Sequence, residues 1–178
     1  MAMELTPLDV SEEPVVAQHP RPRSRIAWVF LLAHGFLLFS AGLYWTFRGR
    51  FFDPKIYEVI GGGSWTLVET VGSDVQNLVA AAVRLGGALA TVLGLFVMAV
   101  AATAYRARER WAWYAMCALP LYVSLDFMTL AGYGALSATS ALWHLTLLGT
   151  ALLGLVPPYA SFFPRASERG DRGMRAHR

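Results

Sequence analysis

Four ionisable side chains fall within long apolar stretches of this sequence: His34, Arg84, Asp126 and His144. Charged groups are costly inside a lipid bilayer, so an ionisable residue in such a stretch marks a candidate functional site. A histidine beside a carboxylate can bind a polar ligand or move a proton. An arginine beside a carboxylate can instead form a buried ion pair that fixes the register of two helices.

Three of these residues lie at similar depth if their segments cross a bilayer as helices. At about 1.5 Å per residue, Arg84, Asp126 and His144 all fall in the outer third of the membrane, whereas His34 lies nearer the cytoplasmic half. We therefore expect Arg84 to contact Asp126, directly or through water. For His34, an interhelical hydrogen bond is favoured over a metal site, because no second ligand lies at a suitable spacing.

Polar side chains also recur along one helical face at i, i+4, i+7 and i+11: Tyr122, Asp126, Thr129 and Tyr133. Two roles are open for an Arg84–Asp126 pair. In the first, the pair is structural and the two tyrosines are its hydrogen-bond partners. In the second, a polar cavity opens to the outer leaflet, and Asp126 and His144 bind a lipid-like or quinone-like ligand or move a proton.

Motifs of known chemistry are missing from the sequence. It contains no nucleophile elbow, no HExxH and no paired catalytic carboxylates, and Gly86-Gly87 lacks the pattern of a phosphate-binding loop. The single cysteine, Cys117, excludes an intrachain disulfide and a CxxC site. We therefore expect no catalytic residue, no metal and no cofactor, and a non-enzymatic role is favoured over an enzyme.

The composition indicates that these segments lie in lipid. The chain has 178 residues, of which 56% are hydrophobic and only 15% charged, whereas a soluble domain carries about 25% charged residues. Of the 15 basic and 12 acidic residues, all but Arg84 and Asp126 lie outside the expected membrane spans. This pattern excludes an ordinary cytosolic enzyme.

Four segments are long and apolar enough to cross a hydrocarbon core of about 30 Å: 26–47, 79–104, 111–133 and 141–163. Pro157-Pro158 should end the regular helix of the last span early. Between the first two spans, 48–78 should lie at the outer surface. There Asp53 caps a short helix, and an amphipathic helix begins near Thr66. A connecting surface helix is favoured over a lid. The prediction is an all-α integral membrane four-helix bundle with this interfacial helix.

Small residues indicate how the spans approach one another. Gly86, Ala90 and Gly94 form a small-residue stripe on the second span, and Gly35 and Gly42 lie seven residues apart on the first. Stripes of this kind permit close contact between membrane helices.

The placement of arginine predicts the orientation. Eleven of the 15 basic residues lie in the ranges 1–25, 106–110 and 164–178, and basic residues accumulate in cytoplasmic segments. We expect 1–25 to be a disordered cytoplasmic tail, 26–163 the four-span domain and 164–178 a basic cytoplasmic tail, in a plasma membrane of the bacterial inner-membrane type. Because the basic residues flank the membrane, no nucleic-acid partner is expected.

The order of the segments along the chain is similar to that of a known group of proteins. An anchor span and a Phe- and Gly-rich stretch precede Arg84-Leu-Gly-Gly-Ala-Leu-Ala and Leu93-Gly-Leu-Phe96, and an arginine break and a third span follow. Over about residues 26–160 this order resembles the small four-span bacterial membrane proteins called DoxX-like. The resemblance implies a membrane subunit that accompanies an oxidoreductase or quinone chemistry. Asp126 among aromatic residues also resembles sterol-isomerase-type ligand-binding bundles, whose further acidic residues this chain lacks.

Two functions follow as hypotheses. The favoured one is a non-enzymatic subunit or accessory protein that packs against membrane lipid, a membrane-protein partner or a second copy of itself. The alternative is a membrane enzyme or carrier that acts on a lipid-like or quinone-like ligand near Arg84, Asp126 and His144. A channel is least favoured, because one ion pair does not line a pore.

Overall fold

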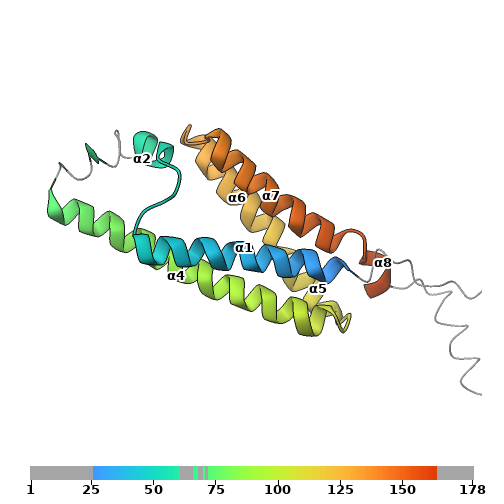
Figure 1. Ribbon diagram of the computed structural model, residues 1–178. Helices are drawn as coiled ribbons and strands as arrows, with labels where there is room; N and C mark the ends of the chain where they lie inside the picture. Colours follow the sequence, from blue (N-terminus) through green and yellow to red (C-terminus); the bar gives the residue numbers. More distant parts are fainter. Residues whose placement is uncertain (1–25, 61–65, 68–69, 71, 164–178) are drawn as a thin grey trace, which may run out of the picture.

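The computed structural model describes residues 26–60, 66–67, 70 and 72–163 (Figure 1). Within these ranges the secondary structure is helical. The elements are α1 (Ala27–Arg48), α2 (Lys55–Ile60), α4 (Ser73–Val100), the π-helical turn η2 (Ala101–Tyr105), α5 (Arg110–Met116), α6 (Ala118–Gly132), α7 (Ala138–Leu155) and α8 (Tyr159–Phe162). The expected all-α class is confirmed. Both tails, and residues 68, 69 and 71 of the amphipathic helix expected from Thr66, lie outside the described residues.

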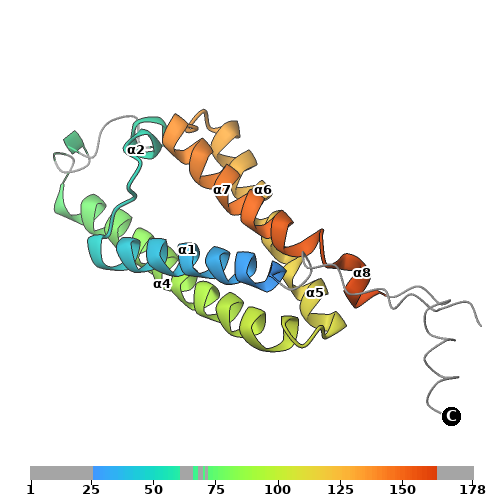
Figure 2. The same cartoon turned by 45° about the vertical axis from the view of Figure 1, so that its right-hand side comes forward.

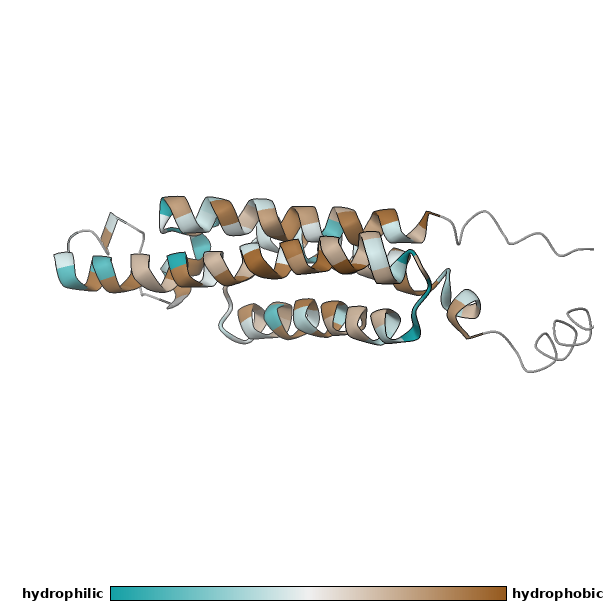
Figure 3. Ribbon diagram, turned by 90° about the horizontal axis from the view of Figure 1, so that it is seen from below, coloured by the Kyte–Doolittle hydropathy of each residue, from teal (hydrophilic) through white to brown (hydrophobic). Residues whose placement is uncertain are grey.

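Four helical segments are long and apolar enough to cross a membrane: Ala27–Arg48, Ser73–Tyr105, Arg110–Gly132 and Ala138–Leu155. The prediction of four such helices is confirmed, but two bounds differ by more than three residues. The second segment begins at Ser73 rather than 79, because the hydrophilic turns before the apolar stretch are also helical, as their teal residues in Figure 3 show. The fourth ends at Leu155 rather than 163, because a proline at 157 or 158 cannot continue the hydrogen-bond ladder.

The long helices form two pairs. Helix α4 packs along α1, α6 packs against α7, and contacts between α1 and α7 join the pairs (Figures 1 and 2). The start of α1, α5 and α8 lie at one end of the molecule. Helix α2 and the α6–α7 connection lie at the other end (Figure 1).

Glycines bring the backbones of α1 and α4 into direct contact. A Cβ atom at Gly94 would lie 2.6 Å from the carbonyl oxygen of Gly35, and one at Gly87 would lie 2.7 Å from that of Gly42. No Cβ fits at such distances, so these four positions require glycine. Gly86, expected in the stripe, has nothing within 4 Å. The contact stripe therefore contains Gly87, one residue further along the helix, because each residue turns the helix face by about 100°.

Apolar side chains fill the space between the helices and also cover their outer surface. The main core lies toward the α5 and α8 end and includes Leu31, Val97 and Met116. Leu89 on α4 and Leu145 on α7 are at least 60% exposed, and large apolar residues are exposed on all four spans. An apolar outer surface of this extent is the one a lipid-embedded protein presents.

Candidate functional site

The ion pair described by the structure joins α6 to α7. His144 Nε2 lies 2.9 Å from Asp126 Oδ2, and this is the one ion pair within the described ranges. The expected direct contact between Arg84 and Asp126 is wrong, because no ion pair joins them within the described ranges. Arg84 is on α4, which packs along α1, whereas Asp126 is on α6, which packs against α7.

Arg84 lies instead over the end of α1. A Cβ atom at Gly49, the left-handed residue that follows α1, would be 2.9 Å from Arg84 Nε. The last carbonyl groups of a helix carry a partial negative charge, which favours a nearby cation. This position explains why an arginine is tolerated on α4 without a carboxylate partner among the described residues.

Hydrogen bonds at both ring nitrogens fix the protonation of the Asp126–His144 pair. His144 Nδ1 lies 2.6 Å from the carbonyl oxygen of Ser140. A carbonyl oxygen only accepts, so Nδ1 carries a hydrogen and donates it. One further proton must then lie between Nε2 and Asp126, on either the ring or the carboxyl group. The pair therefore holds one exchangeable proton and is neutral overall.

The two members of the pair differ in exposure. The His144 side chain is 6% exposed and that of Asp126 is 48% exposed. Asp126 Oδ1 forms no hydrogen bond to the described part of the chain. This oxygen can accept a hydrogen bond from a ligand without disturbing His144.

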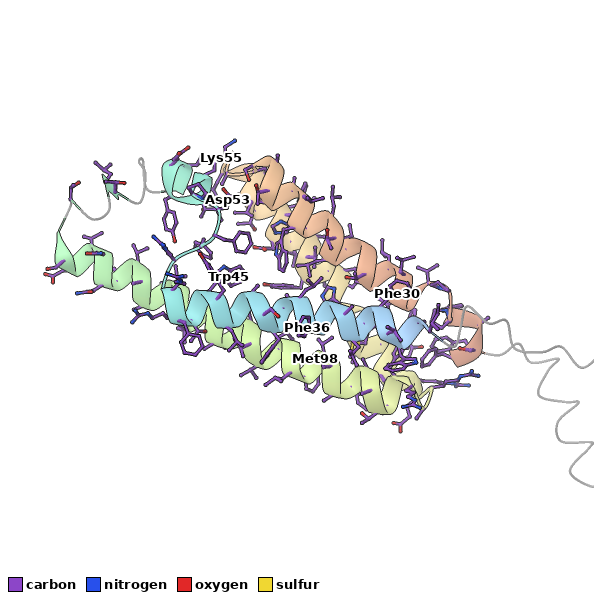
Figure 4. The ribbon with its side chains drawn as sticks, in the orientation of Figure 1. Phe30, Phe36, Trp45, Asp53, Lys55 and Met98 are labelled. Carbon is purple, nitrogen blue, oxygen red and sulfur yellow. The ribbon has the colours of Figure 1, made fainter. Side chains whose placement is uncertain are left out.

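A second carboxylate, Asp53, lies close to this pair and is almost fully buried. Its Oδ1 accepts a hydrogen bond from the Lys55 backbone at 3.0 Å, which is the expected cap of α2. Its Oδ2 accepts one from the hydroxyl group of Ser137. Lys55 Nζ donates to the carbonyl oxygen of Leu136 at 3.0 Å. These contacts tie the start of α2 to the α6–α7 connection, at the end of the molecule that carries the Asp53 and Lys55 labels in Figure 4.

Serines at the start of α7 link Asp53 to His144. Ser137 caps the helix: its hydroxyl oxygen accepts from the Ser140 backbone at 3.0 Å, and its own backbone donates to Ser140 Oγ at 2.9 Å. One turn later His144 donates to the Ser140 carbonyl. A backbone carbonyl carries no transferable proton, so this chain orients the imidazole of His144 rather than conducting protons to Asp53.

Four of these polar residues, Asp53, Asp126, Ser140 and His144, line a cavity of about 150 Å³. The cavity is lined by Trp45, Phe51, Phe52, Asp53, Ile56, Asp126, Leu130, Ser140, Trp143 and His144. The aromatic residues of the lining, here called the aromatic wall, contact one another: Trp45 stacks on Phe52 at 5.8 Å, and Phe52 meets Trp143 edge-on at the same distance. The Trp45 indole N–H is buried and has no partner in the described residues. A cavity of about this volume holds one benzene-sized ring.

Tyr57 holds the segment that carries the aromatic wall. The Phe51 N–H donates to the Tyr57 hydroxyl oxygen at 2.5 Å, and the two rings pack at 5.9 Å. Burial raises the pKa of Tyr57 above its ordinary value. The hydroxyl group therefore stays neutral, and the wall keeps its position over the physiological pH range.

The other predicted site residues do not join this cluster. Tyr122 and Thr129 are exposed on α6, and Tyr133 is exposed just after it. The Thr129 hydroxyl donates to its own helix at Leu125. Neither tyrosine hydroxyl has a partner among the residues described, so the hypothesis that they bond to Asp126 is wrong. Of this stripe, Asp126 is the member that pairs across to α7.

Histidine 34 lies outside the cluster, buried between α1 and α7. Its Nδ1 is 3.0 Å from both the Leu147 carbonyl oxygen and the Thr150 hydroxyl oxygen. This is the interhelical hydrogen bond expected from the sequence.

Sequence reasoning missed Asp53, Trp45 and Trp143 as site residues. The two tryptophans lie near the ends of their spans, where an aromatic belt is the ordinary explanation. Asp53 precedes proline, which is typical of a helix cap. No local signal links Asp53 to Ser137, which is 84 positions away.

Comparison with protein-family models, curated proteins and solved structures found no match to this chain. The function must therefore be argued from the chain's own cavity and from its hydrogen bonds.

Proposed function

We propose that this chain is an integral membrane protein that binds a lipid-like ligand with a ring-sized polar head in the cavity beside Asp126 and His144. The observation that carries this proposal is the placement of the neutral Asp126–His144 pair in the wall of an aromatic cavity. Pockets for small molecules combine an apolar lining with a few such polar groups. The favoured role is binding or carrying, because the serine of the lining, Ser140, has its hydroxyl group hydrogen-bonded to Ser137 rather than to a base such as His144.

The free polar groups of the cavity define the ligand. The Trp45 indole N–H can donate to a carbonyl or hydroxyl oxygen, and Asp126 Oδ1 can accept from a hydroxyl or N–H group. The rings of Trp45, Phe52 and Trp143 favour a flat, aromatic or unsaturated head. A cavity of about 150 Å³ admits the head alone, so the rest of the ligand would lie among the helices or in the lipid.

The proposal includes an arrangement in the membrane. The four spans form a bundle in a bacterial inner membrane, both termini lie on the cytoplasmic side, and the 48–78 segment lies at the outer interface. The arginines at 106, 108 and 110 support this orientation, because they lie at the end opposite the uncharged 134–140 connection. The cavity then opens near the outer leaflet.

Alkylphenols test the cavity directly. We expect para-hexylphenol to raise the thermal unfolding midpoint of the detergent-solubilised protein, because its hydroxyl group can donate to Asp126. Hexylbenzene, which lacks that group, should raise it less. Asp126→Ala should remove the difference between the two compounds, because alanine has no oxygen atom that can accept a hydrogen bond from the phenol.

Asp74→Ala is the matched control, since Asp74 is an exposed acid in the first turn of α4. This variant should keep the full preference for the phenol. Equal shifts by both compounds in the unaltered protein would contradict the proposal, as would an unchanged preference in Asp126→Ala.

The accessory-subunit function remains a second candidate, favoured by Tyr122. This side chain lies near the middle of the third span and is 43% exposed, and its hydroxyl group has no partner in the described ranges. An unpaired hydroxyl facing hydrocarbon is unfavourable, so a partner helix or second copy would satisfy it. Tyr122→Phe should then weaken co-purification of that partner in mild detergent. A monomer free of partners at native expression would contradict this candidate.

A further inference from the structure

A second cavity, of about 230 Å³, lies at the other end of the molecule and has a basic rim. It is lined by Trp28, Tyr105, Arg106, Arg108, Pro158, Ser161 and Phe162. We propose that it binds the phosphate group of an anionic membrane phospholipid. Because none of its lining residues belongs to the Asp126–His144 cavity, this proposal does not depend on the function proposed above.

Both arginines of the rim are free of carboxylate partners in the described part of the chain. The guanidinium carbon of Arg106 lies 5.3 Å from the ring centroid of Trp28. Stacking of this kind holds the guanidinium in place while its edge N–H groups remain available. Arginine donates paired hydrogen bonds to phosphate oxygens, so this rim has the chemistry that a phosphate needs.

The backbone at Arg108 gives a second, independent indication. The Glu109 N–H donates to the Ala104 carbonyl at 3.0 Å, and the Arg108 N–H donates to Tyr105 at 2.9 Å. This is the helix-ending turn in which the left-handed residue is usually glycine. Arg108 occupies that position with φ of 64°. A strained non-glycine residue that lines a cavity indicates that its side chain is used there.

The floor of the cavity favours a lipid over a soluble anion. Tyr105, Pro158 and Phe162 are buried, and the Tyr105 ring packs 4.8 Å from that of Phe162. The Tyr105 hydroxyl donates to the Gly154 carbonyl at 2.6 Å, which fixes this ring. A phospholipid places apolar glycerol and acyl carbons beside its phosphate, and basic pockets between membrane helices hold such headgroups.

Lipid retention measured by native mass spectrometry tests this site. The full-length protein would be titrated with phosphatidylglycerol, with phosphatidylcholine and, separately, with inorganic phosphate. We expect a preference for phosphatidylglycerol that falls about fivefold in Arg108→Gly and again in Arg106→Gln, as for the loss of one basic contact each. Arg48→Gln is the matched control, because Arg48 is an exposed arginine at the other end of α1.

Arg108→Gly keeps the test interpretable, because glycine adopts the left-handed backbone without strain and the variant should fold at least as well as the unaltered protein. An unchanged preference in Arg108→Gly and Arg106→Gln would overturn the proposal, and so would an equal loss in Arg48→Gln. Binding of inorganic phosphate with no preference for phosphatidylglycerol would overturn the lipid assignment in favour of a soluble phosphate.

Discussion

The two helix pairs of this molecule are held together by different means. Helices α1 and α4 touch through their backbones at Gly35, Gly42, Gly87 and Gly94, and no space remains between them there. Helices α6 and α7 touch through side chains, among them Val123, Leu147 and the Asp126–His144 pair, and a cavity borders that pair.

This difference suits the two pairs to different roles. Close packing of small residues is a main source of attraction between helices in lipid, where burial of apolar surface contributes little. The α1–α4 pair therefore supplies a rigid support. The α6–α7 pair is packed less closely and leaves room for a ligand beside its polar groups.

The largest effect should come from filling the α1–α4 contact. Gly94→Leu places a side chain against the backbone of Gly35, so the helices must separate, and we expect a loss of about 3 kcal/mol or more in the free energy of unfolding. Titration with sodium dodecyl sulfate in mixed micelles would measure it. Gly86→Leu is the control, because Gly86 has open space around it and should change stability by less than about 0.5 kcal/mol. Similar losses in both variants would remove the distinction between the pairs.

A smaller effect is expected from breaking the α6–α7 pair. Asp126→Ala leaves His144 buried with one unpaired nitrogen, and we expect a loss of about 2 kcal/mol, less than for a fully buried pair because Asp126 is half exposed. The double variant with His144→Ala should lose less than the sum of the two single losses, since the residues share one interaction. Strict additivity in the same titration would show that the pair contributes nothing to stability.

The sequence predicted the helices well because spanning a membrane leaves a strong local signal. A charge-free run of about 20 residues between basic or polar flanks is visible without any tertiary information. The end of the fourth helix at Leu155 follows in the same way, from Pro157 and Pro158.

The site could be predicted only in part, because its assembly depends on which helices are neighbours. The expected depth in the membrane made both Arg84 and His144 possible partners of Asp126. In the structure α6 packs against α7, so the partner is His144. On α4, the glycine that contacts α1 is Gly87, one residue after the expected Gly86. The contribution of Asp53 required knowing that the α2 segment returns to the start of α7.

The contact between the two pairs can be tested at His34, which reaches from α1 to the Leu147 carbonyl on α7. His34→Leu removes this hydrogen bond while keeping an apolar side chain of similar size. We expect a loss of about 1 kcal/mol, because Thr150 still donates to the same carbonyl. Phe36→Leu, at an exposed position of α1, should have a smaller effect. If His34→Leu destabilises as much as Gly94→Leu, the contact between the pairs at His34 contributes as much stability as the contact within the α1–α4 pair, which would contradict the comparison.

The smallest effect, and one of opposite sign, is expected in the connection that joins the α4 end to α5 and α6. Arg108 has a left-handed backbone conformation. This conformation destabilises the folded state by about 1–2 kcal/mol for a residue with a side chain, and Arg108→Gly removes that strain. Glycine also makes the unfolded chain more flexible, which offsets about 1 kcal/mol. The net gain should be about 0.5 kcal/mol in lipid-free detergent, measured by the same titration. Added phosphatidylglycerol should reverse the order of the two proteins, because only the one with Arg108 has the complete phosphate rim. If Arg108→Gly raises the free energy of unfolding equally with and without this lipid, Arg108 does not bind the lipid phosphate. The connection would then do no more than join the α1–α4 pair to the α6–α7 pair.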